Sequence, residues 1–494
     1  MPALPDSLPT AGAVLAALVV LGLRPNLKRN AHLPPGPPQD PLIGHLRSMP
    51  VTKIADTYHQ WAQKYGDVMH LQLPGVSFIV LGSHDAAVEL LEKRSAIYSG
   101  RPKFMGWKNI LPFISSGERF RRHRQALQTY LTPESSLLKF GDVQTRAARR
   151  LAKRMIDEQR EDEEYERYLS EFSTTVAVYA MNGHEITSED DEYTRRRSSE
   201  DIHRDGSAWG DGRGHVPIPG LLPWLVPRRT PCRRRSKPPI AHHLLEHPMN
   251  EVNLNEQREA ETATESFLLH QLERADALLD KEELQGAGAT GFIGGKLTTL
   301  STLTVFLLAM ILHPQTQLKA QEELDRVLGE AHLPTLADRK DLPYVEALVQ
   351  EVYRWNPVLQ LGIPHVLEAE DEYRGWMIPK GAVVFANIKG ISLDASIYTT
   401  PDSFNPERFL PTSPEPKFTD VFGYGRRVCV GRHLADNGIW IAAATILASC
   451  KITNALDSGG SPIVPSCEMT DGMDSHPRNV KCVVTARFPG GFDV

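Results

Sequence analysis

The residues around Cys429 have types and spacing that could make one cysteine reactive. Cys429 lies in the run FGYGRRVCVG at 422–431 and directly precedes a predicted helix. Gly425 and Gly431 permit backbone conformations and close approaches that a Cβ would block. The helix dipole and nearby arginines favour a thiolate, so we expect the pKa of Cys429 to lie below that of a free thiol. A structural cysteine in a turn is the alternative, but it leaves the surrounding glycine, arginine and aromatic residues unexplained.

Two other segments carry polar groups at informative spacings. Glu351 and Arg354 stand three residues apart, so they can pair on one face of a helix. A long apolar segment at 286–310 contains the hydroxyl pair Thr298 and Thr299. A threonine in a helix more often donates to the preceding turn than takes part in catalysis.

The composition is that of an ordinary globular protein. The chain has 494 residues, of which 41% are hydrophobic and 23% charged, and its formal net charge is −6. This balance gives no general reason to expect nucleic acid as a partner, and we expect none. The five cysteines form no CxxC pair, which argues against a disulfide framework or a zinc ribbon and fits a reducing compartment.

Hydrophobic periodicity predicts a mainly α-helical chain with a minor β-sheet. The length exceeds the usual single-domain size, but an α-rich enzyme can build one large core, and we expect a single domain at 31–494. Helices are expected at 51–65, 85–93, 116–130, 144–168, 170–181, 266–285 leading into 286–310, 314–328, 344–355 and 432–450, and strands at 68–73, 77–81, 365–368 and 383–387.

An apolar segment near the N-terminus predicts a membrane anchor. Residues 8–23 are nearly all apolar and basic residues follow, a charge pattern that keeps the rest of the chain in the cytosol. The run is short for a bilayer span, so a cleaved signal peptide and a buried or peripheral helix are the alternatives. We expect 1–30 to be the anchor and its flank, followed by a stiff proline strut at 34–38.

The segment at 195–239 has no helical or strand period. It combines two arginine clusters with glycines and a proline-rich stretch. This composition is typical of a solvated loop. The alternative is a surface that contacts anionic lipid, because basic residues beside leucine and tryptophan suit a membrane interface.

The run at 422–431 resembles the haem-binding loop of the cytochrome P450 family, FxxGxRxCxG, at every fixed position. Haem held by a cysteine thiolate is the known ligation of that family. The resemblance implies that Cys429 is the axial ligand of haem b iron and that Phe422 packs against it. It also places Arg427 at a haem propionate and Gly431 in the haem-binding loop.

A second group of residues resembles the structural triad of the same family. Glu351 and Arg354 form an ExxR motif, and the run FNPERF at 404–409 follows it. The resemblance implies that Glu351 and Arg354 are bridged to Arg408 in a buried network that specifies structure and does no chemistry.

Two further positions resemble haem propionate contacts. Phe120 and Arg124 match a WxxxR motif with phenylalanine in place of tryptophan, which keeps the aromatic wall and loses the indole N–H. By the same resemblance Arg124 and His365 each bind a propionate.

The central apolar segment departs from the family pattern at one position. Family members usually show (A/G)-G-x-(D/E)-T there, and Leu297 stands where the acid is usual. The resemblance assigns Thr298, with Thr299 beside it, as the catalytic proton-relay hydroxyl. Loss of the acid predicts slow proton delivery and leakage of reducing equivalents into hydrogen peroxide.

The resemblance covers most of the chain and is closest to microsomal, fungal members. It implies a monooxygenase that inserts one oxygen atom into an apolar small molecule, in fungal secondary or xenobiotic metabolism. Electrons would come from NADPH through a separate reductase at the basic proximal face. The protein would lie on the endoplasmic reticulum membrane with its catalytic domain facing the cytosol, and 195–239 would lie in its atypical lid.

Two alternatives stay open. Leu297 and the unusual lid favour a haem protein of the same fold with impaired or repurposed activity, such as an isomerase or dehydratase. A membrane-attached binding protein without haem is the other alternative. The substrate itself cannot be derived from the residues expected to contact it, at 104–113 and 358–363.

Overall fold

The computed structural model describes residues 32–102, 109–158, 165–188, 191, 193, 264–274, 278–478 and 480–488. The expected membrane anchor at 8–23 and the lid region at 195–239 lie outside these residues. The proline strut at 34–38 is described, and it lies against β1 (Val68–Leu73): His70 N–H donates to Pro35 O at 2.9 Å.

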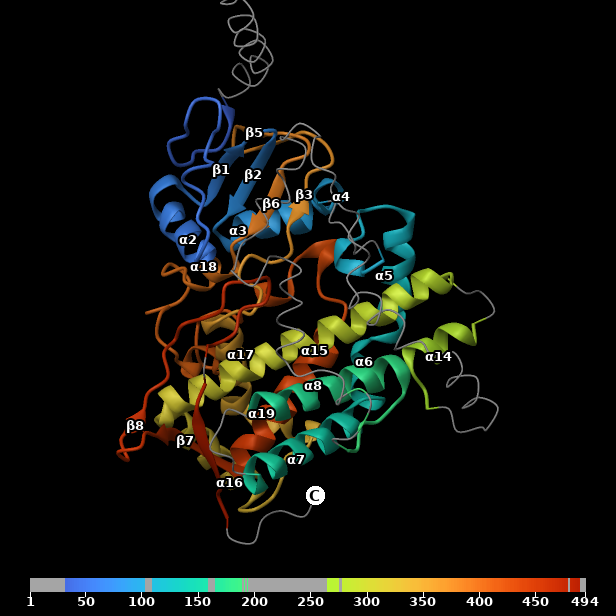
Figure 1. The fold of residues 1–494 in the computed structure, drawn as a ribbon, viewed down its shortest axis with the longest axis vertical. Coiled ribbons are helices and arrows are strands. Elements are labelled where there is room, and N and C mark those ends of the chain that lie inside the picture. The colour runs from blue at the N-terminus through green and yellow to red at the C-terminus, as the bar shows by residue number, and fades with distance from the viewer. Residues whose placement is uncertain are drawn as a thin grey trace, which may run out of the picture.

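The long helix α15 (Lys281–Leu312) runs diagonally through the helical body (Figure 1). Asp280 and Glu283 form a capping box that fixes its start. It is the one described helix that is long and apolar enough to span a membrane, but 78% of its most apolar 18-residue window is buried in the protein. Its apolar character is therefore that of a core helix.

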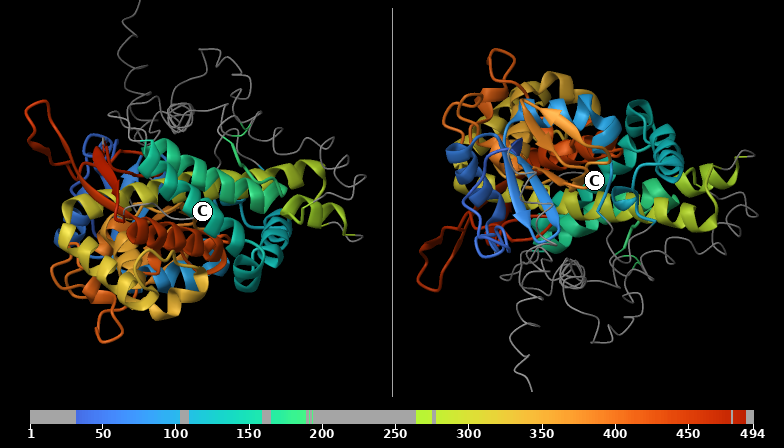
Figure 2. Two further views of the ribbon diagram at one scale, coloured as in Figure 1. Left: turned by 90° about the horizontal axis from the view of Figure 1, so that it is seen from below. Right: turned by 90° about the horizontal axis from the view of Figure 1, so that it is seen from above.

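Five further helices pack with α15 into a bundle (Figures 1 and 2). α8 packs along α15, α7 lies against α8 and α19, and both α16 and α17 contact α19. Small residues allow α8 and α15 to approach closely, since a Cβ on Gly295 of α15 would lie only 3.2 Å from the Cβ of Ala177 in α8. Their bounds are α7 (Gly141–Asp157), α8 (Tyr165–Asn182), α16 (Pro314–Leu328), α17 (Pro343–Trp355) and α19 (Arg432–Ser449).

The other described helices are short, apart from α2 and α5. They are α2 (Ile54–Tyr65), α3 (His84–Ala87), η2 (Val88–Lys93), α4 (Ser95–Tyr98), η3 (Leu111–Phe113), α5 (Glu118–Tyr130), α6 (Pro133–Leu138), α14 (Phe267–Leu272), η6 (Leu336–Asp341), α18 (Ile388–Ser392), η7 (Pro406–Phe409), η8 (Asp420–Phe422) and η9 (Gly425–Arg427).

The main sheet lies at one end of the molecule (Figure 1). Its strand order is β1-β2-β6-β3. The pairs β1–β2 and β6–β3 are antiparallel, and the pair β2–β6 is parallel. A β4-β5 hairpin and a β8-β7-β9 sheet complete the strands. The bounds are β2 (Val76–Leu81), β3 (His365–Val366), β4 (Asp371–Tyr373), β5 (Trp376–Ile378), β6 (Val383–Ala386), β7 (Cys450–Leu456), β8 (Pro462–Ile463) and β9 (Cys482–Ala486).

The fold confirms the expected class, mainly α with a minor β-sheet, and corrects two helices. A single helix over 144–168 is wrong, because α7 ends at Asp157 and α8 begins at Tyr165. A continuous helical stretch over 266–310 is also wrong, since α14 ends at Leu272 and Asp280 caps a new helix. The three-stranded C-terminal sheet was not predicted, although β7 begins with alternating buried and exposed residues.

Candidate active site

The loop before α19 presents Cys429 in a conformation that glycine makes possible. Gly425 has a φ of +49°, and a Cβ there would lie 2.7 Å from Leu91 O of η2. The loop closes on itself through Cys429 N–H, which donates to Phe422 O at 2.7 Å. Gly425 is therefore needed both for its backbone conformation and for close packing on η2.

The Cys429 thiol faces an interior space. Its surface is open to a water-sized probe, yet burial within the protein raises its pKa. A sulfur that is open to a probe and yet surrounded by protein faces a hollow inside the molecule. Gly294 of α15 and Gly431 border open space as well, since a Cβ on either would have no neighbouring atom within 4 Å.

The pKa of Cys429 corrects an expectation from the sequence. Burial raises this pKa, although the Gly431 N–H, Arg124 and Arg432 act in the predicted, lowering direction. The expected lowering is wrong for the protein alone, because desolvation of the thiolate outweighs the helix terminus and the arginines. Binding to a metal ion deprotonates a coordinating thiol regardless.

Four basic side chains lie within electrostatic range of one another close to this loop. Burial lowers the pKa of each of them. Repulsion within the group lowers three of these pKa values further: Arg427 acts on Arg101, both of these arginines act on His365, and Arg124 acts on Arg427. The pKa of Arg427 falls to about 10. Among the described residues, Glu368 is the one carboxylate that raises any of these pKa values. The four residues are Arg101, Arg124, His365 and Arg427.

The backbone holds each of these cations in place. Arg427 Nε donates to Ser99 O at 2.9 Å, and Arg101 Nη1 donates to the carbonyls of Ile363 and Pro364 at 2.8 Å each. Arg124 Nη1 donates to Val428 O. His365 Nδ1 lies 2.6 Å from Tyr98 O.

Unsatisfied donors in this cluster indicate what it binds. Arg427 Nη1 and Arg101 Nε are buried and have no hydrogen-bond partner. A buried cation needs an opposite charge, because its desolvation is otherwise uncompensated. The cluster therefore fits an anionic group with carboxylates, and the two propionates of a haem beside Cys429 meet that requirement.

Arg101 is a candidate site residue that was not predicted from the sequence. It is buried, at 6% exposure, and it follows Gly100, where a Cβ would lie 2.5 Å from Val366 O. Gly100 and Val366 form a β-bridge that sets Arg101 beside His365. The run SGRP at 99–102 was a weak signal, since only this pairing with a distant strand shows its meaning.

The central helix borders the interior space with few polar groups. Thr298 Oγ1 donates to Gly294 O at 2.6 Å, so its hydrogen is engaged in the preceding turn and its oxygen keeps lone pairs for another donor. Thr299 is only 6% exposed. Of the two predicted relay residues, Thr298 is the less buried.

Glu351, Arg354 and Arg408 come together in the protein interior. Glu351 accepts from Arg354 Nε and Nη2 at 2.8 Å each and from Arg408 Nε at 3.2 Å. All three side chains are at most 1% exposed. Arg408 also pairs with Glu415 at 2.6 Å, so the network balances two arginines with two carboxylates.

The described residues hold no cluster of three or more His, Cys, Asp or Glu side chains that could bind a metal ion. The other described cysteines are Cys450, Cys467 and Cys482, and none forms a disulfide. Burial raises the pKa of both Cys450 and Cys482 to about 12. Cys467 is also exposed, but a single lysine, Lys389, acts to lower its pKa, whereas two arginines, Arg124 and Arg432, act on Cys429.

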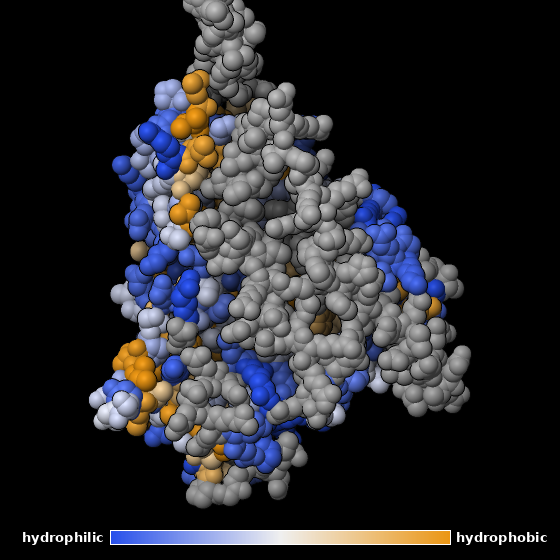
Figure 3. All heavy atoms as spheres, viewed as in Figure 1, coloured by the Kyte–Doolittle hydropathy of each residue, from blue (hydrophilic) through white to orange (hydrophobic). Residues whose placement is uncertain are grey.

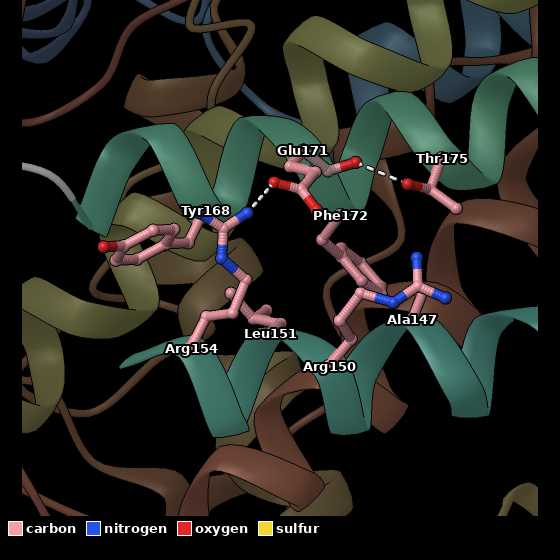
Figure 4. A pocket seen from close by; sticks show the side chains of 8 residues that line it. All are labelled: Ala147, Arg150, Leu151, Arg154, Tyr168, Glu171, Phe172 and Thr175. Carbon is pink, nitrogen blue, oxygen red and sulfur yellow. Dashed lines mark hydrogen bonds and ion pairs between the residues drawn. The ribbon is translucent and has the colours of Figure 1, made fainter. Parts of the chain in front are cut away.

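A small cleft lies between α7 and α8 (Figure 4), and none of the candidate site residues lines it. Arg154 forms an ion pair with Glu171 across it, and its guanidinium lies 4.6 Å from the ring centre of Tyr168. These contacts join the two helices. The lining residues are Ala147, Arg150, Leu151, Arg154, Tyr168, Glu171, Phe172 and Thr175.

Comparisons with known proteins agree on one family. A family model described as Cytochrome P450 matches residues 34–466. Cytochrome P450 monooxygenase 176 of Postia placenta is 32% identical over 479 residues, covering 92% of this chain and 90% of that protein. Cytochrome P450 monooxygenase COX2 of Coprinopsis cinerea is 31% identical over 509 residues, covering 97% and 94%.

A solved structure agrees on the fold. A zebra fish cytochrome P450 with progesterone has a TM-score of 0.73 at 24% identity, covering 88% of this chain and 99% of that chain. The fold and site define a helical protein with an open cysteine in a glycine-bearing loop and a buried cluster of cations close to that loop. The chain belongs to the cytochrome P450 family, and it is a monooxygenase of that family with relatives in fungi. Membership implies a haem cofactor, electrons from a redox partner and small-molecule substrates.

Proposed function

We propose that this protein is a membrane-attached monooxygenase with haem b. It takes electrons from NADPH through a separate reductase and inserts one oxygen atom of O2 into an apolar small molecule, in fungal secondary or xenobiotic metabolism. The observation that carries the proposal is the pairing of the open Cys429 sulfur with a buried cluster of uncompensated cations.

The residues of the site would have distinct roles. Cys429 would ligate the iron, while Arg101, Arg124, His365 and Arg427 would hold the propionates. Haem bound to a thiolate supplies the activation of dioxygen, because the thiolate pushes electron density toward cleavage of the O–O bond. Phe422 and Gly431 would support the loop.

The central helix supports an apolar substrate. The stretch that borders the interior space offers Gly294 and Leu297, with the Thr298 hydroxyl as its polar group. Such a lining excludes water around the reacting carbon and orients the substrate by shape.

Membrane attachment is proposed from the apolar segment at 8–23 and from the strut that follows it. His45 Nε2 lies 2.8 Å from Pro37 O, and a Cβ on Gly36 would lie 2.2 Å from His70 O, so the strut is closely held by the body. Leu42 and Val51, directly beyond it, are 63% and 50% exposed. Figure 3 shows hydrophobic residues on the surface near this end, beside β1. We propose the endoplasmic reticulum membrane as the site, with the catalytic domain facing the cytosol.

A carbon monoxide spectrum tests the cofactor and its ligand. The reduced protein under carbon monoxide should show the strongly red-shifted Soret band of thiolate-bound haem. Cys429→Ala should abolish that band, whereas Cys450→Ala and Cys467→Ala should keep it. A band that survives Cys429→Ala would show that the ligand assignment is wrong. NADPH-dependent formation of a hydroxylated product, with reductase present, tests the activity.

A second candidate function is favoured by Leu297, since the acid usual at this position is missing. The protein would then be a haem protein of impaired or repurposed activity, such as an isomerase or dehydratase. Substrate conversion without NADPH consumption would support this candidate over the monooxygenase.

A further inference from the structure

A carboxylate from a distant loop reaches the central helix one turn beyond Leu297. Ser301 Oγ of α15 donates to Asp474 Oδ2 at 3.2 Å, across 173 positions of sequence. Ser301 is 1% exposed, whereas the Asp474 side chain keeps 24% exposure. The contact therefore joins a buried hydroxyl to a carboxylate that water can reach.

Helix geometry puts this contact on the face of the missing acid. Ser301 follows Leu297 by four residues, so their side chains lie one above the other on the same face. Ser301 follows Gly294 by seven residues, which at about 100° per residue places the two within about 20° of each other around the axis. A Cβ on Gly294 would have no neighbouring atom within 4 Å, so Ser301 lies on the face of α15 that borders open space at Gly294.

The loop that carries Asp474 is fixed from three sides. Thr470 N–H donates to His476 O at 2.8 Å and closes the loop. Asp471 Oδ1 accepts from Lys53 N–H at 2.8 Å, and Ser475 N–H donates to Val358 O at 2.7 Å. Asp474 is therefore held against α15 by the backbone around it and not by Ser301 alone.

We propose that Asp474, acting through Ser301, replaces the acid missing at Leu297 and delivers protons to the distal side of the haem. The proposal rests on the monooxygenase function proposed above. In that reaction a substrate RH, O2, NADPH and H⁺ give ROH, H2O and NADP⁺. The oxygen atom that leaves as water takes up two protons, and NADPH supplies both electrons. Asp474 gives up each proton and recovers it from solvent, so it is unchanged at the end of the cycle.

The relay needs one water molecule between Ser301 and Thr298. Residues three apart on a helix have Cβ atoms about 5–6 Å apart, a gap that one bridging water spans. Thr298 Oγ1 already donates to Gly294 O, so its oxygen is left as an acceptor that orders such a water. His476 Nδ1 lies 4.0 Å from Asp474 Oδ2, so this histidine is a titratable neighbour of the carboxylate.

Product formed per NADPH consumed tests the relay. Asp474→Asn keeps the size of the side chain and removes the acid. General acid catalysis is worth about 10² to 10⁴ in rate, so product per NADPH should fall at least about tenfold and peroxide should rise. Asp471→Asn removes a carboxylate charge from the same loop but keeps the Oδ1 that accepts from Lys53 N–H, so it should leave the ratio unchanged. Adding Leu297→Asp to Asp474→Asn should restore coupling, which a merely structural role of Asp474 would not predict.

A spectroscopic measurement separates this proposal from the proposed function. The infrared C–O stretch of carbon monoxide in the reduced protein reports the field in the distal space, and Asp474→Asn should shift it while Asp471→Asn should not. An unchanged stretch, together with unchanged coupling or a change in KM alone, would overturn the relay. Failure of the parent protein to show the thiolate band and any NADPH-dependent product would instead overturn the proposed function, and the relay with it.

Discussion

The guanidinium carbon of Arg427 lies 3.6 Å from the centre of the Phe120 ring. This contact joins the cysteine loop to α5, and Phe120 is itself buried, at 7% exposure. Arg427 Nε and Nη2 both donate to Ser99 O, so the stacked guanidinium directs its remaining nitrogen, Nη1, to an unfilled hydrogen bond. The Phe120 ring thus stacks on Arg427 and orients its guanidinium.

Replacing Phe120 should change how tightly the haem is held. A cation–π contact is worth about 0.5–2 kcal/mol, so Phe120→Leu should speed haem loss about 2- to 30-fold at 1.4 kcal/mol per tenfold. Phe120→Trp should hold haem at least as tightly as the parent, because tryptophan is the best cation–π partner and adds an N–H donor. The measurement is the rate of haem transfer to excess apomyoglobin.

Phe409→Leu is the matched control for this prediction. Phe409 is 6% exposed and packs against Tyr398 at 6.2 Å between ring centres. Its loss removes a buried ring without disturbing Arg427. Equal haem loss from Phe120→Leu and Phe409→Leu would show that the stacked ring has no specific effect.

Removal of the Glu351 carboxylate should strongly destabilise the folded protein. Glu351→Gln leaves Arg354 and Arg408 without their shared carboxylate in a region that is at most 1% exposed. Breaking a buried ion pair on one side costs about 3–5 kcal/mol, so the midpoint of urea unfolding should fall steeply. Glu407→Gln removes an exposed carboxylate paired with Lys319 and should cost less than about 1 kcal/mol. Similar losses in both variants would contradict the structural role of the triad.

The sequence predicts those parts of the site whose geometry is local. The cysteine loop is predictable because Gly425 and Gly431 and the helix after them impose its shape within ten residues. Arg101 and Asp474 are not, because each gains its role from a partner far along the chain, through the Gly100–Val366 bridge and the Ser301 hydroxyl. The pKa of Cys429 was predicted in the wrong direction for the same reason, since tertiary burial outweighs the local dipole.

Acid should destabilise the protein through His123. This residue is fully buried on α5, and neither ring nitrogen has a hydrogen-bond partner. Burial lowers its pKa from 6.5 to about 4, with Arg119 and Arg122 acting the same way against Glu283 and Asp280. Between these values the unfolded chain binds the proton and the folded protein does not. His123 therefore leaves the free energy of unfolding unchanged above about pH 6.5 and lowers it progressively as the pH falls toward 4.

His123→Leu should remove this acid sensitivity. Urea unfolding at several pH values should give a variant that gains on the parent as the pH falls from 7.5 to 5, by up to about 1.4 kcal/mol per pH unit. Leucine gives up no hydrogen bond at this position, because neither ring nitrogen of His123 has a partner in the folded parent. Parallel stability curves for the two proteins would show that His123 does not titrate in this window.

Deleting residues 1–30 should release much of the protein from membranes. We expect the apolar run at 8–23 to supply the main attachment. Two arginines in its middle, Leu15→Arg with Leu18→Arg, should then have the same effect as the deletion, because each costs about 2.5–3.5 kcal/mol at the centre of a bilayer. The measurement is the share of protein in the pellet after carbonate washing. Binding that survives deletion should weaken further with Leu42→Ser and Val51→Ser, since these side chains are 63% and 50% exposed beyond the strut. A full-length protein found wholly in the supernatant would show that the apolar run is no anchor.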